Sequence, residues 1–177
     1  ILGRALEAEG WKVAMLPRPD VRHVESVRTF GSPRLFWAVT AGALDSMLAN
    51  YTAQKKPRSD DPYAPGGDAV GRPDRAVTAY CNLIRKAFGK QAFIVAGGIE
   101  ASMRRFAHYD YWSDSVRRPL LMDCGANVIV HGMGEGPLLM MARRVADATE
   151  HSGRSDGRKP GTEALVAAVK DVPGVVY

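Results

Sequence analysis

The segment from Met103 to Arg118, MRRFAHYDYWSDSVRR, concentrates side chains that could bind a ligand. Arginines interleaved with aromatic rings suit stacking on bases and contacts to phosphates, and they suit a protein interface equally well. His108 and Asp110 could form a catalytic or metal-binding pair, but two ligands do not make a metal site. A histidine among aromatic residues also serves as hydrogen-bonded structure. We predict a substrate-facing or interdomain surface at Arg104, Arg105, His108, Tyr109, Asp110 and Trp112.

Two glycine-rich turns follow short apolar runs that resemble buried strands. Ala92–Ala96 runs into a Gly-Gly pair and Val128–His131 into a Gly-Met-Gly-Glu turn. Ligands of α/β proteins collect at the carboxyl ends of parallel strands. Neither turn has the G-x-G-x-x-G spacing or the lysine of a phosphate-binding loop, so a tight turn without a ligand is the alternative. The cofactor-facing turns predicted here contain Gly97, Gly98, Glu100, Gly132, Gly134 and Glu135.

The stretch from Thr52 to Arg72 is rich in proline, glycine and charge. It is long for a loop of a compact domain, so it is either disordered, as its composition favours, or an ordered functional loop. Its Ser-Asp-Asp run could bind Mg²⁺, although nothing beyond the carboxylates supports that. We include it in the predicted substrate or interdomain surface through Arg58, Asp60, Asp61 and Tyr63. No known catalytic motif occurs, so we assign no catalytic residue and no metal ligand.

The elements that position these residues alternate between short strands and helices. The pattern predicts α/β architecture with a doubly wound, mostly parallel sheet and flanking helices. Ile1 opens in what reads as a helix, so we expect the first strand to precede this sequence and the chain to be a piece of a longer one. The expected strands are 12–16, 35–39, 92–96, 128–131 and 174–177. The expected helices are 1–9, 44–51, 74–88, 113–122, one that begins near Pro137, and 162–170. We expect Asp74 to cap the helix 74–88, and we expect a loop over 151–161.

Composition bounds the remaining possibilities. The chain has 177 residues, is 46% hydrophobic and 24% charged, and carries a net charge of +5, values of an ordinary globular domain. Two distant cysteines exclude a dense disulfide scaffold and a four-cysteine metal site within this chain. No apolar run reaches the roughly 20 residues that span a bilayer, so we expect no membrane contact and a cytoplasmic location. The positive charge favours anionic partners or reflects arginine-rich codon usage.

Several long strings together resemble one family. KKPRSDDPYAPGG, AGGIEASMRRFAHYDYW, HGMGEGP and TAGALDSMLANYTA are similar to the N-terminal region of the YgiQ family of radical S-adenosylmethionine proteins, and the resemblance runs from Ile1 to about Asp147. It implies that residues 1–177 form an N-terminal α/β domain with a cobalamin-binding-like, flavodoxin- or Rossmann-like fold. A downstream barrel would bind S-adenosylmethionine and hold a four-iron four-sulfur cluster through a Cys-x3-Cys-x2-Cys motif. This chain lacks that motif, and it lacks the Asp-x-His-x-x-Gly motif of base-off cobalamin binding, which argues against cobalamin.

The resemblance implies an accessory domain that faces an unknown substrate and the barrel of the same protein, without catalytic residues or a bound cofactor of its own. Two alternatives remain from the residues alone. One is a stand-alone nucleotide- or cofactor-binding module. The other is an RNA-binding module, which needs Arg104, Arg105, Tyr109 and Trp112 on one exposed face.

Overall fold

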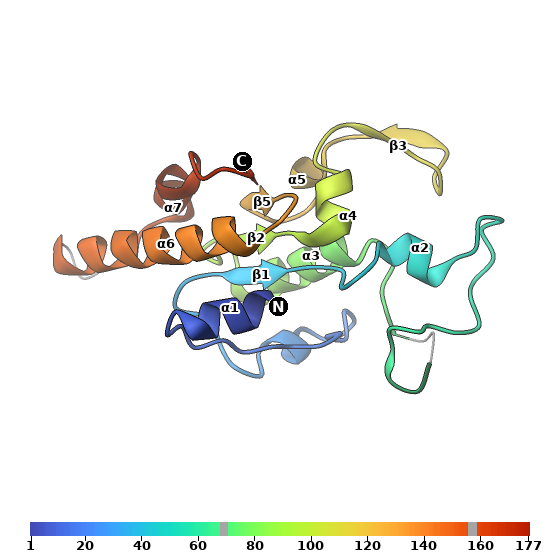
Figure 1. Ribbon diagram of the computed structural model, residues 1–177, viewed down its shortest axis with the longest axis horizontal. Coiled ribbons are helices and arrows are strands. Elements are labelled where there is room, and N and C mark those ends of the chain that lie inside the picture. The colour runs from blue at the N-terminus through green and yellow to red at the C-terminus, as the bar shows by residue number, and fades with distance from the viewer. Residues whose placement is uncertain (68–70, 156–158) are drawn as a thin grey trace.

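A four-stranded sheet forms the centre of the molecule in the computed structural model, which describes residues 1–67, 71–155 and 159–177 (Figure 1). The strand order is β1-β2-β5-β6, and β1, β2 and β5 are parallel whereas β6 is antiparallel to β5. Trp37 pairs with Ile94, and Val95 pairs with Val128. The strands are β1 (Trp37–Val39), β2 (Ile94–Ala96), β5 (Val128–Val130) and β6 (Val175–Val176).

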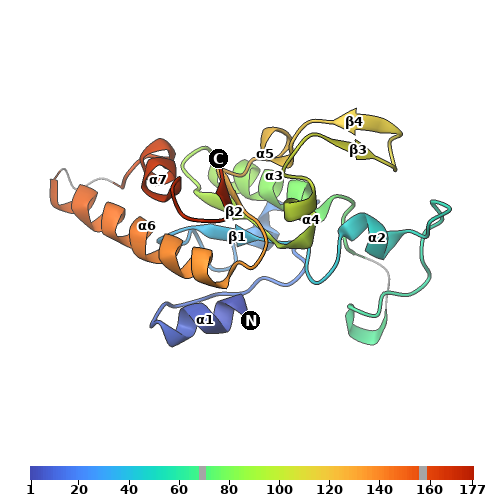
Figure 2. The ribbon, with the colours of Figure 1, turned by 45° about the horizontal axis from the view of Figure 1, so that its top comes forward.

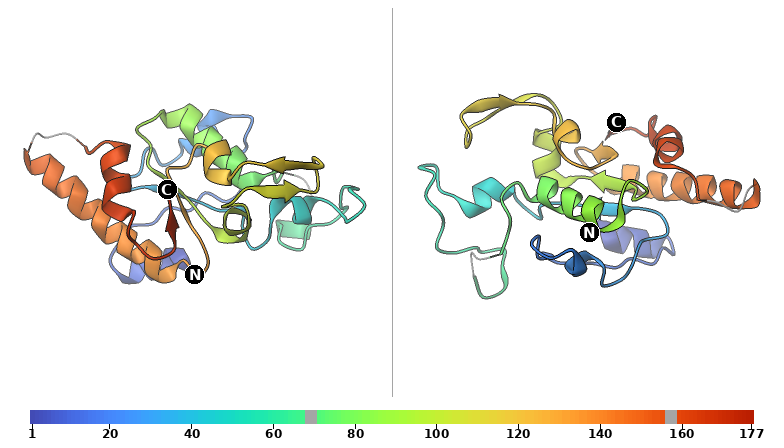
Figure 3. Two further views of the ribbon diagram at one scale, coloured as in Figure 1. Left: turned by 90° about the horizontal axis from the view of Figure 1, so that it is seen from above. Right: turned by 180° about the vertical axis from the view of Figure 1, so that it is seen from behind.

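Both faces of the sheet are covered, as the uninterrupted apolar strands predict. Because successive side chains of a strand point to opposite faces, Ile94 and Ile129 pack in one cluster with α3 (Ala76–Phe88). Val95 and Val128 pack in the other cluster with α6 (Glu135–Ser155) and α7 (Thr162–Val169). Figures 2 and 3 show these helices on either side of the strands. The expected α/β class with a mostly parallel sheet and flanking helices is confirmed.

Shorter elements complete the chain. A two-stranded antiparallel hairpin, β3–β4, projects beside the sheet and is visible above α4 in Figure 1. The remaining elements are α1 (Leu2–Ala8), η1 (Val24–Val27), α2 (Ser46–Asn50), η2 (Pro65–Gly67), α4 (Gly98–Met103), β3 (His108–Asp110), β4 (Ser115–Arg117) and α5 (Leu120–Asp123).

Two expected elements are wrong. The run 12–16 is not a strand, because it pairs with no neighbour and leaves Val13 and Met15 exposed. The segment 113–122 is not one helix. Asp114 adopts a left-handed φ of 49° that turns the chain into β4, and Pro119 precedes the short α5, consistent with the inability of proline to continue a helix.

Two helix boundaries also differ from the prediction. Arg75, at φ 49°, stands at the N-cap of α3, and the predicted cap Asp74 instead accepts hydrogen bonds from Asn50 and Tyr51. Helix α6 continues to Ser155, into the predicted loop 151–161, of which residues 156–158 lie outside the described part of the chain. No helix among the described residues is long and apolar enough to cross a membrane.

Candidate functional site

The turns after β1 and β2 contact each other at the carboxyl ends of the parallel strands. Gly98 adopts φ +80°, and a Cβ atom built there would lie 2.4 Å from Thr40 Oγ1. Only glycine therefore fits, since a side chain would suffer both the backbone strain and the clash. The turn after β5 joins the same edge, because the Gly132 amide donates to Ser102 Oγ of α4 at 3.2 Å.

Glu100 of α4 links three elements beneath this edge. The side chain is fully buried, and its two carboxylate oxygens accept hydrogen bonds from the Ser46 amide at 2.8 Å and the Val77 amide at 2.9 Å. Helix starts leave such amides without intrahelical partners. Glu100 therefore satisfies donors at the start of α2 and of α3.

Arg104 extends this network to α2. Asp45 caps α2 by accepting from the Met47 amide at 2.9 Å, and its other oxygen contacts the Arg104 guanidinium. Arg104 also lies 4.0 Å from Glu100, and its side chain is only 13% exposed. An arginine held this way cannot reach freely to an RNA phosphate, so the geometry does not favour the RNA-binding alternative.

Asp110 ties the hairpin to the start of α3. Its buried carboxylate accepts from Arg75 at 2.5 Å and from Ser113 Oγ at 2.6 Å, with Arg117 at 3.8 Å. Burial alone would raise the pKa of Asp110, but the hydrogen bonds from Ser113 and Arg75 outweigh it and lower the pKa to about 2. The ionised form is thus the one that the fold stabilises.

This pKa sets an expected acid dependence of stability. The unfolded carboxyl group titrates near ~3.9, so the contribution of Asp110 is fully present above that pH and is lost as the pH falls toward its folded pKa of about 2. We expect the stability difference between wild type and Asp110→Asn, about 2 kcal/mol at neutral pH, to shrink between about pH 4 and pH 2. Urea denaturation at several pH values measures this difference, and a constant gap would contradict the assignment.

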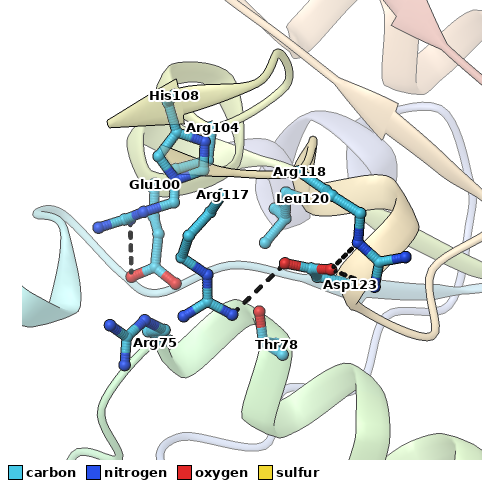
Figure 4. Close-up of a pocket in the computed structure, with 9 residues that line it drawn as sticks. All are labelled: Arg75, Thr78, Glu100, Arg104, His108, Arg117, Arg118, Leu120 and Asp123. Atoms are coloured by element: carbon cyan, nitrogen blue, oxygen red, sulfur yellow. Dashed lines mark hydrogen bonds and ion pairs between the residues drawn. The ribbon is translucent and has the colours of Figure 1, made fainter. Parts of the chain in front are cut away.

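Four arginines surround a narrow cleft between α3, α4 and the hairpin (Figure 4). Each faces a carboxylate: Arg75 pairs with Asp110, Arg104 with Asp45, and Arg117 and Arg118 both with Asp123. The cleft volume is about 10 Å³, room for about one water. His108 donates from Nδ1 to the Phe106 carbonyl at 3.0 Å, and its Nε2 is buried without a partner among the described residues. We interpret the cleft as an ion-pair network that fixes the hairpin.

The charged loop after α2 makes specific contacts within its described residues. Asp61 and Arg72 form a buried ion pair at 2.7 Å, and the Arg58 guanidinium donates to the carbonyls of Leu48 and Tyr51. These contacts support the ordered-loop alternative over the disorder that composition favours. Asp60 and Tyr63 are exposed at the surface, whereas Asp61 is not available there.

The loop and the hairpin tip pack against each other through aromatic rings. The Tyr51 and Trp112 ring centroids are 5.3 Å apart, and Trp112 also meets Tyr111 edge-on. Tyr111 donates its hydroxyl to the Ala53 carbonyl at 2.7 Å, and the Lys55 ammonium lies 4.6 Å from the Tyr111 ring centroid. A groove of about 350 Å³ opens between them, lined by Met47, Tyr51, Lys55, Asp74, Arg75, Trp112 and Ser113.

The structure therefore divides the predicted site residues. Glu100, Arg104, Asp61 and Asp110 are internal, whereas Tyr109 is exposed and Arg105 stacks over Phe106. Sequence reasoning missed the residues on the facing elements: Asp45, Ser46, Tyr51, Lys55, Asp74 and Arg75. The Asp-Ser pair before a short apolar helix is a capping signal that could have located the first two. A Cβ atom built at Gly132 or at Gly136 would have no atom within 4 Å among the described residues.

Metal chemistry finds no support in the described residues. No group of three or more His, Cys, Asp or Glu side chains comes together there as a metal site. Cys81 and Cys124 are both buried in the apolar core that α3 shares with the sheet. Two thiols are too few for an iron–sulfur cluster of the four-cysteine kind.

Taken together, fold and site define an α/β domain whose strand-end edge is built to hold a loop and a hairpin in place. A family model described as Radical SAM N-terminal matches residues 1–175. A UPF0313 protein of Geobacter sulfurreducens is 52% identical to the chain, over 82% of the chain and 24% of the relative's own length. A UPF0313 protein of Methanocella arvoryzae is 50% identical, over 86% of the chain and 26% of its own length. A UPF0313 protein of Thermotoga neapolitana is 49% identical over 81% of the chain and 25% of its own length. No solved structure matches.

The chain belongs to the Radical SAM N-terminal family and corresponds to the N-terminal domain of UPF0313 proteins. The sequence resemblance to radical S-adenosylmethionine proteins is thereby confirmed. The chain spans about a quarter of the length of the curated relatives it matches. The cobalamin-binding-like likeness, the doubly wound order and a strand preceding Ile1 stay predictions.

Proposed function

We propose that this domain is the accessory, substrate-facing part of a longer iron–sulfur enzyme. The matched family and the quarter-length coverage support a downstream barrel that binds S-adenosylmethionine and a four-iron four-sulfur cluster. The cluster would reductively cleave S-adenosylmethionine and supply a radical there, while this domain covers the barrel mouth and shields the reaction. A cytoplasmic location belongs to the same proposal.

One observation carries the proposed position of the domain: large apolar side chains are exposed on α4, on the hairpin and in the turn after β5. Tyr109 and Val116 face each other across the hairpin strands and are 59% and 77% exposed, and Met133 beside α4 is 84% exposed. An exposed apolar surface of this kind marks an interaction site. The opposite hairpin face is used internally by Asp110, so the hairpin joins the domain on one side and offers apolar contacts on the other. The exposed apolar side chains on and next to these segments are Ile99, Met103, Phe106, Tyr109, Val116 and Met133.

The cofactor part of the proposal is tested on the full-length gene product purified without oxygen. About four irons per chain, with a visible spectrum that bleaches on reduction, would support the parent enzyme. If iron stays absent after reconstitution with iron and sulfide, the stand-alone binding module becomes the better interpretation.

The position of the domain gives a separate prediction. In the full-length protein, Tyr109→Ser combined with Val116→Ser should remove apolar contacts to the barrel and leave iron content unchanged. Hydrogen–deuterium exchange should then rise in the barrel segment that the hairpin covers, by about tenfold or more if the contacts contribute over ~1.4 kcal/mol.

Phe30→Ser is the matched control, because Phe30 is 61% exposed and follows η1, far from the hairpin in the chain. It should leave barrel exchange unchanged. Equal exchange in the hairpin variant and the control would refute the proposed docking face.

A further inference from the structure

The groove between the loop after α2 and the hairpin tip has the size and lining of a small-molecule site. Its volume of about 350 Å³ falls within the range of ligand pockets. Its walls come from segments far apart in the chain: Tyr51 and Lys55 on one side, Arg75 at the start of α3, and Trp112 on the hairpin. Unlike the arginine cleft, it is not filled by mutual ion pairs.

The aromatic wall of the groove is held in place before any ligand arrives. Tyr51 donates its hydroxyl to Asp74 at 2.8 Å, and Asp74 also accepts from Asn50 at 2.9 Å. Trp112 contacts the rings of Tyr51 and Tyr111 and is only partly buried. Fixed rings lose little conformational entropy on binding, and they offer stacking to any planar group.

Two cations line the same groove. No carboxylate in the described part of the chain lies within ion-pair distance of Lys55, whose ammonium rests over Tyr111. Arg75 lines the groove as well, and its Nη2 donates to Asp110 at 2.5 Å. Asp74 is the one carboxylate among the lining residues, and Asp110 pairs with Arg75. Lys55 is therefore the lining cation that has no carboxylate partner among the described residues.

The backbone around the groove is strained in a way that favours a binding role. Lys55 and Arg75 have φ values of 60° and 49°, and Asp114, next to Ser113 of the groove, has 49°. These are three of the four non-glycine residues with positive φ among those that the structure describes. Such strain persists where surrounding contacts impose it, and it gathers at ligand sites.

We propose that this groove binds a planar heteroaromatic ring that carries an anionic group, with a nucleoside monophosphate as the smallest common example. The ring stacks on Trp112, and Lys55 and Arg75 contact the anion. The proposal goes beyond the proposed function, because the groove belongs to this domain and needs no cluster to bind such a ligand.

The test is isothermal titration of the full-length protein with adenosine 5′-monophosphate. Saturating S-adenosylmethionine is present to fill the adenosyl site that the proposed barrel would have. We expect one site per chain. Adenosine, which lacks the anion, and inorganic phosphate, which lacks the ring, should each bind at least about tenfold more weakly.

Variants assign the binding to the groove. Trp112→Leu should weaken affinity at least about fivefold, the lower end expected for a lost stacking platform. Lys55→Ala should weaken it by a similar factor and reduce its salt dependence. Lys56→Ala, an equally charged neighbour that does not line the groove, should have no effect.

Three results would overturn the proposal: no binding of the nucleotide, equal binding of phosphate alone, or unchanged affinity in Lys55→Ala. Because Lys55 is exposed, its replacement tests the groove even if Trp112→Leu fails to fold. Iron content is measured on the same preparations. A failure of nucleotide binding with a normal cluster is therefore distinct from a failure of the proposed function.

Discussion

Glu100→Ala is expected to destabilise the domain by about 3–5 kcal/mol, the range for breaking a buried charged network. The substitution leaves the buried amides of Ser46 and Val77 without acceptors and removes a carboxylate from beside Arg104. Buried donors without partners carry the full desolvation cost. Hydrogen–deuterium exchange of the full-length protein measures the effect, and we expect amides at the starts of α2 and α3 to exchange at least about a hundredfold faster.

Two further variants separate the carboxylate from simple loss of a side chain. Glu100→Gln keeps one acceptor oxygen but turns an amide group toward the second donor, so its effect should be intermediate. Glu25→Ala removes an exposed carboxylate and should stay within about 0.5 kcal/mol of wild type. If the amides at the starts of α2 and α3 exchange at the same rate in Glu100→Ala as in Glu25→Ala, the proposed linking role of Glu100 is wrong.

Gly98→Ala should produce a second large loss, about 3 kcal/mol or more. Left-handed backbone costs a non-glycine residue roughly 1–2 kcal/mol, and the new Cβ would also lie 2.4 Å from Thr40 Oγ1. Gly132→Ala provides the matched comparison, because Gly132 has φ +73° but nothing within 4 Å of its Cβ position. It should cost only the backbone part, about 1 kcal/mol.

The steric part of this loss can be isolated with a second substitution. Adding Thr40→Ala to Gly98→Ala removes the clashing hydroxyl and should restore part of the stability, which a double-mutant cycle in urea denaturation would quantify. The remaining loss should match that of Gly132→Ala. Equal losses for Gly98→Ala and Gly132→Ala, or no recovery with Thr40→Ala, would show that the turns after β1 and β2 do not meet as described.

Local sequence was sufficient for the central strands β2 and β5 and for the turns that follow them. In a parallel sheet, uninterrupted apolar runs such as VIV are buried on both faces, and this pattern predicted β2 and β5 and the helices that cover them. The glycines that follow had to allow close approach, and Gly98 does so. Such features depend on residues that are neighbours in the chain. The family was identified from long sequence strings that are specific to it.

The elements predicted wrongly depend on distant partners. Asp74 is of a residue type that commonly caps helices, but its carboxylate accepts hydrogen bonds from Asn50 and Tyr51. The free amides at the start of α3 donate to Ser46 and Glu100 instead. The segment after Ser113 could have been helical by composition. In the structure, Asp110 of β3 accepts from Arg75 of the α3 N-cap, with Arg117 of β4 at 3.8 Å, and this stabilises a hairpin.

The sequence by itself thus determined the α/β class, the strand-end glycine turns and the family of this protein, because those depend on local periodicity and on contiguous strings. Only the tertiary structure decided which predicted site residues are internal, as Glu100 and Arg104 are, and which groove the loop and the hairpin form. Tyr51 and Trp112 are 61 positions apart in the numbering. Their contact depends on how Glu100 and its partners hold α2, α3 and α4 together, and no local pattern records that arrangement.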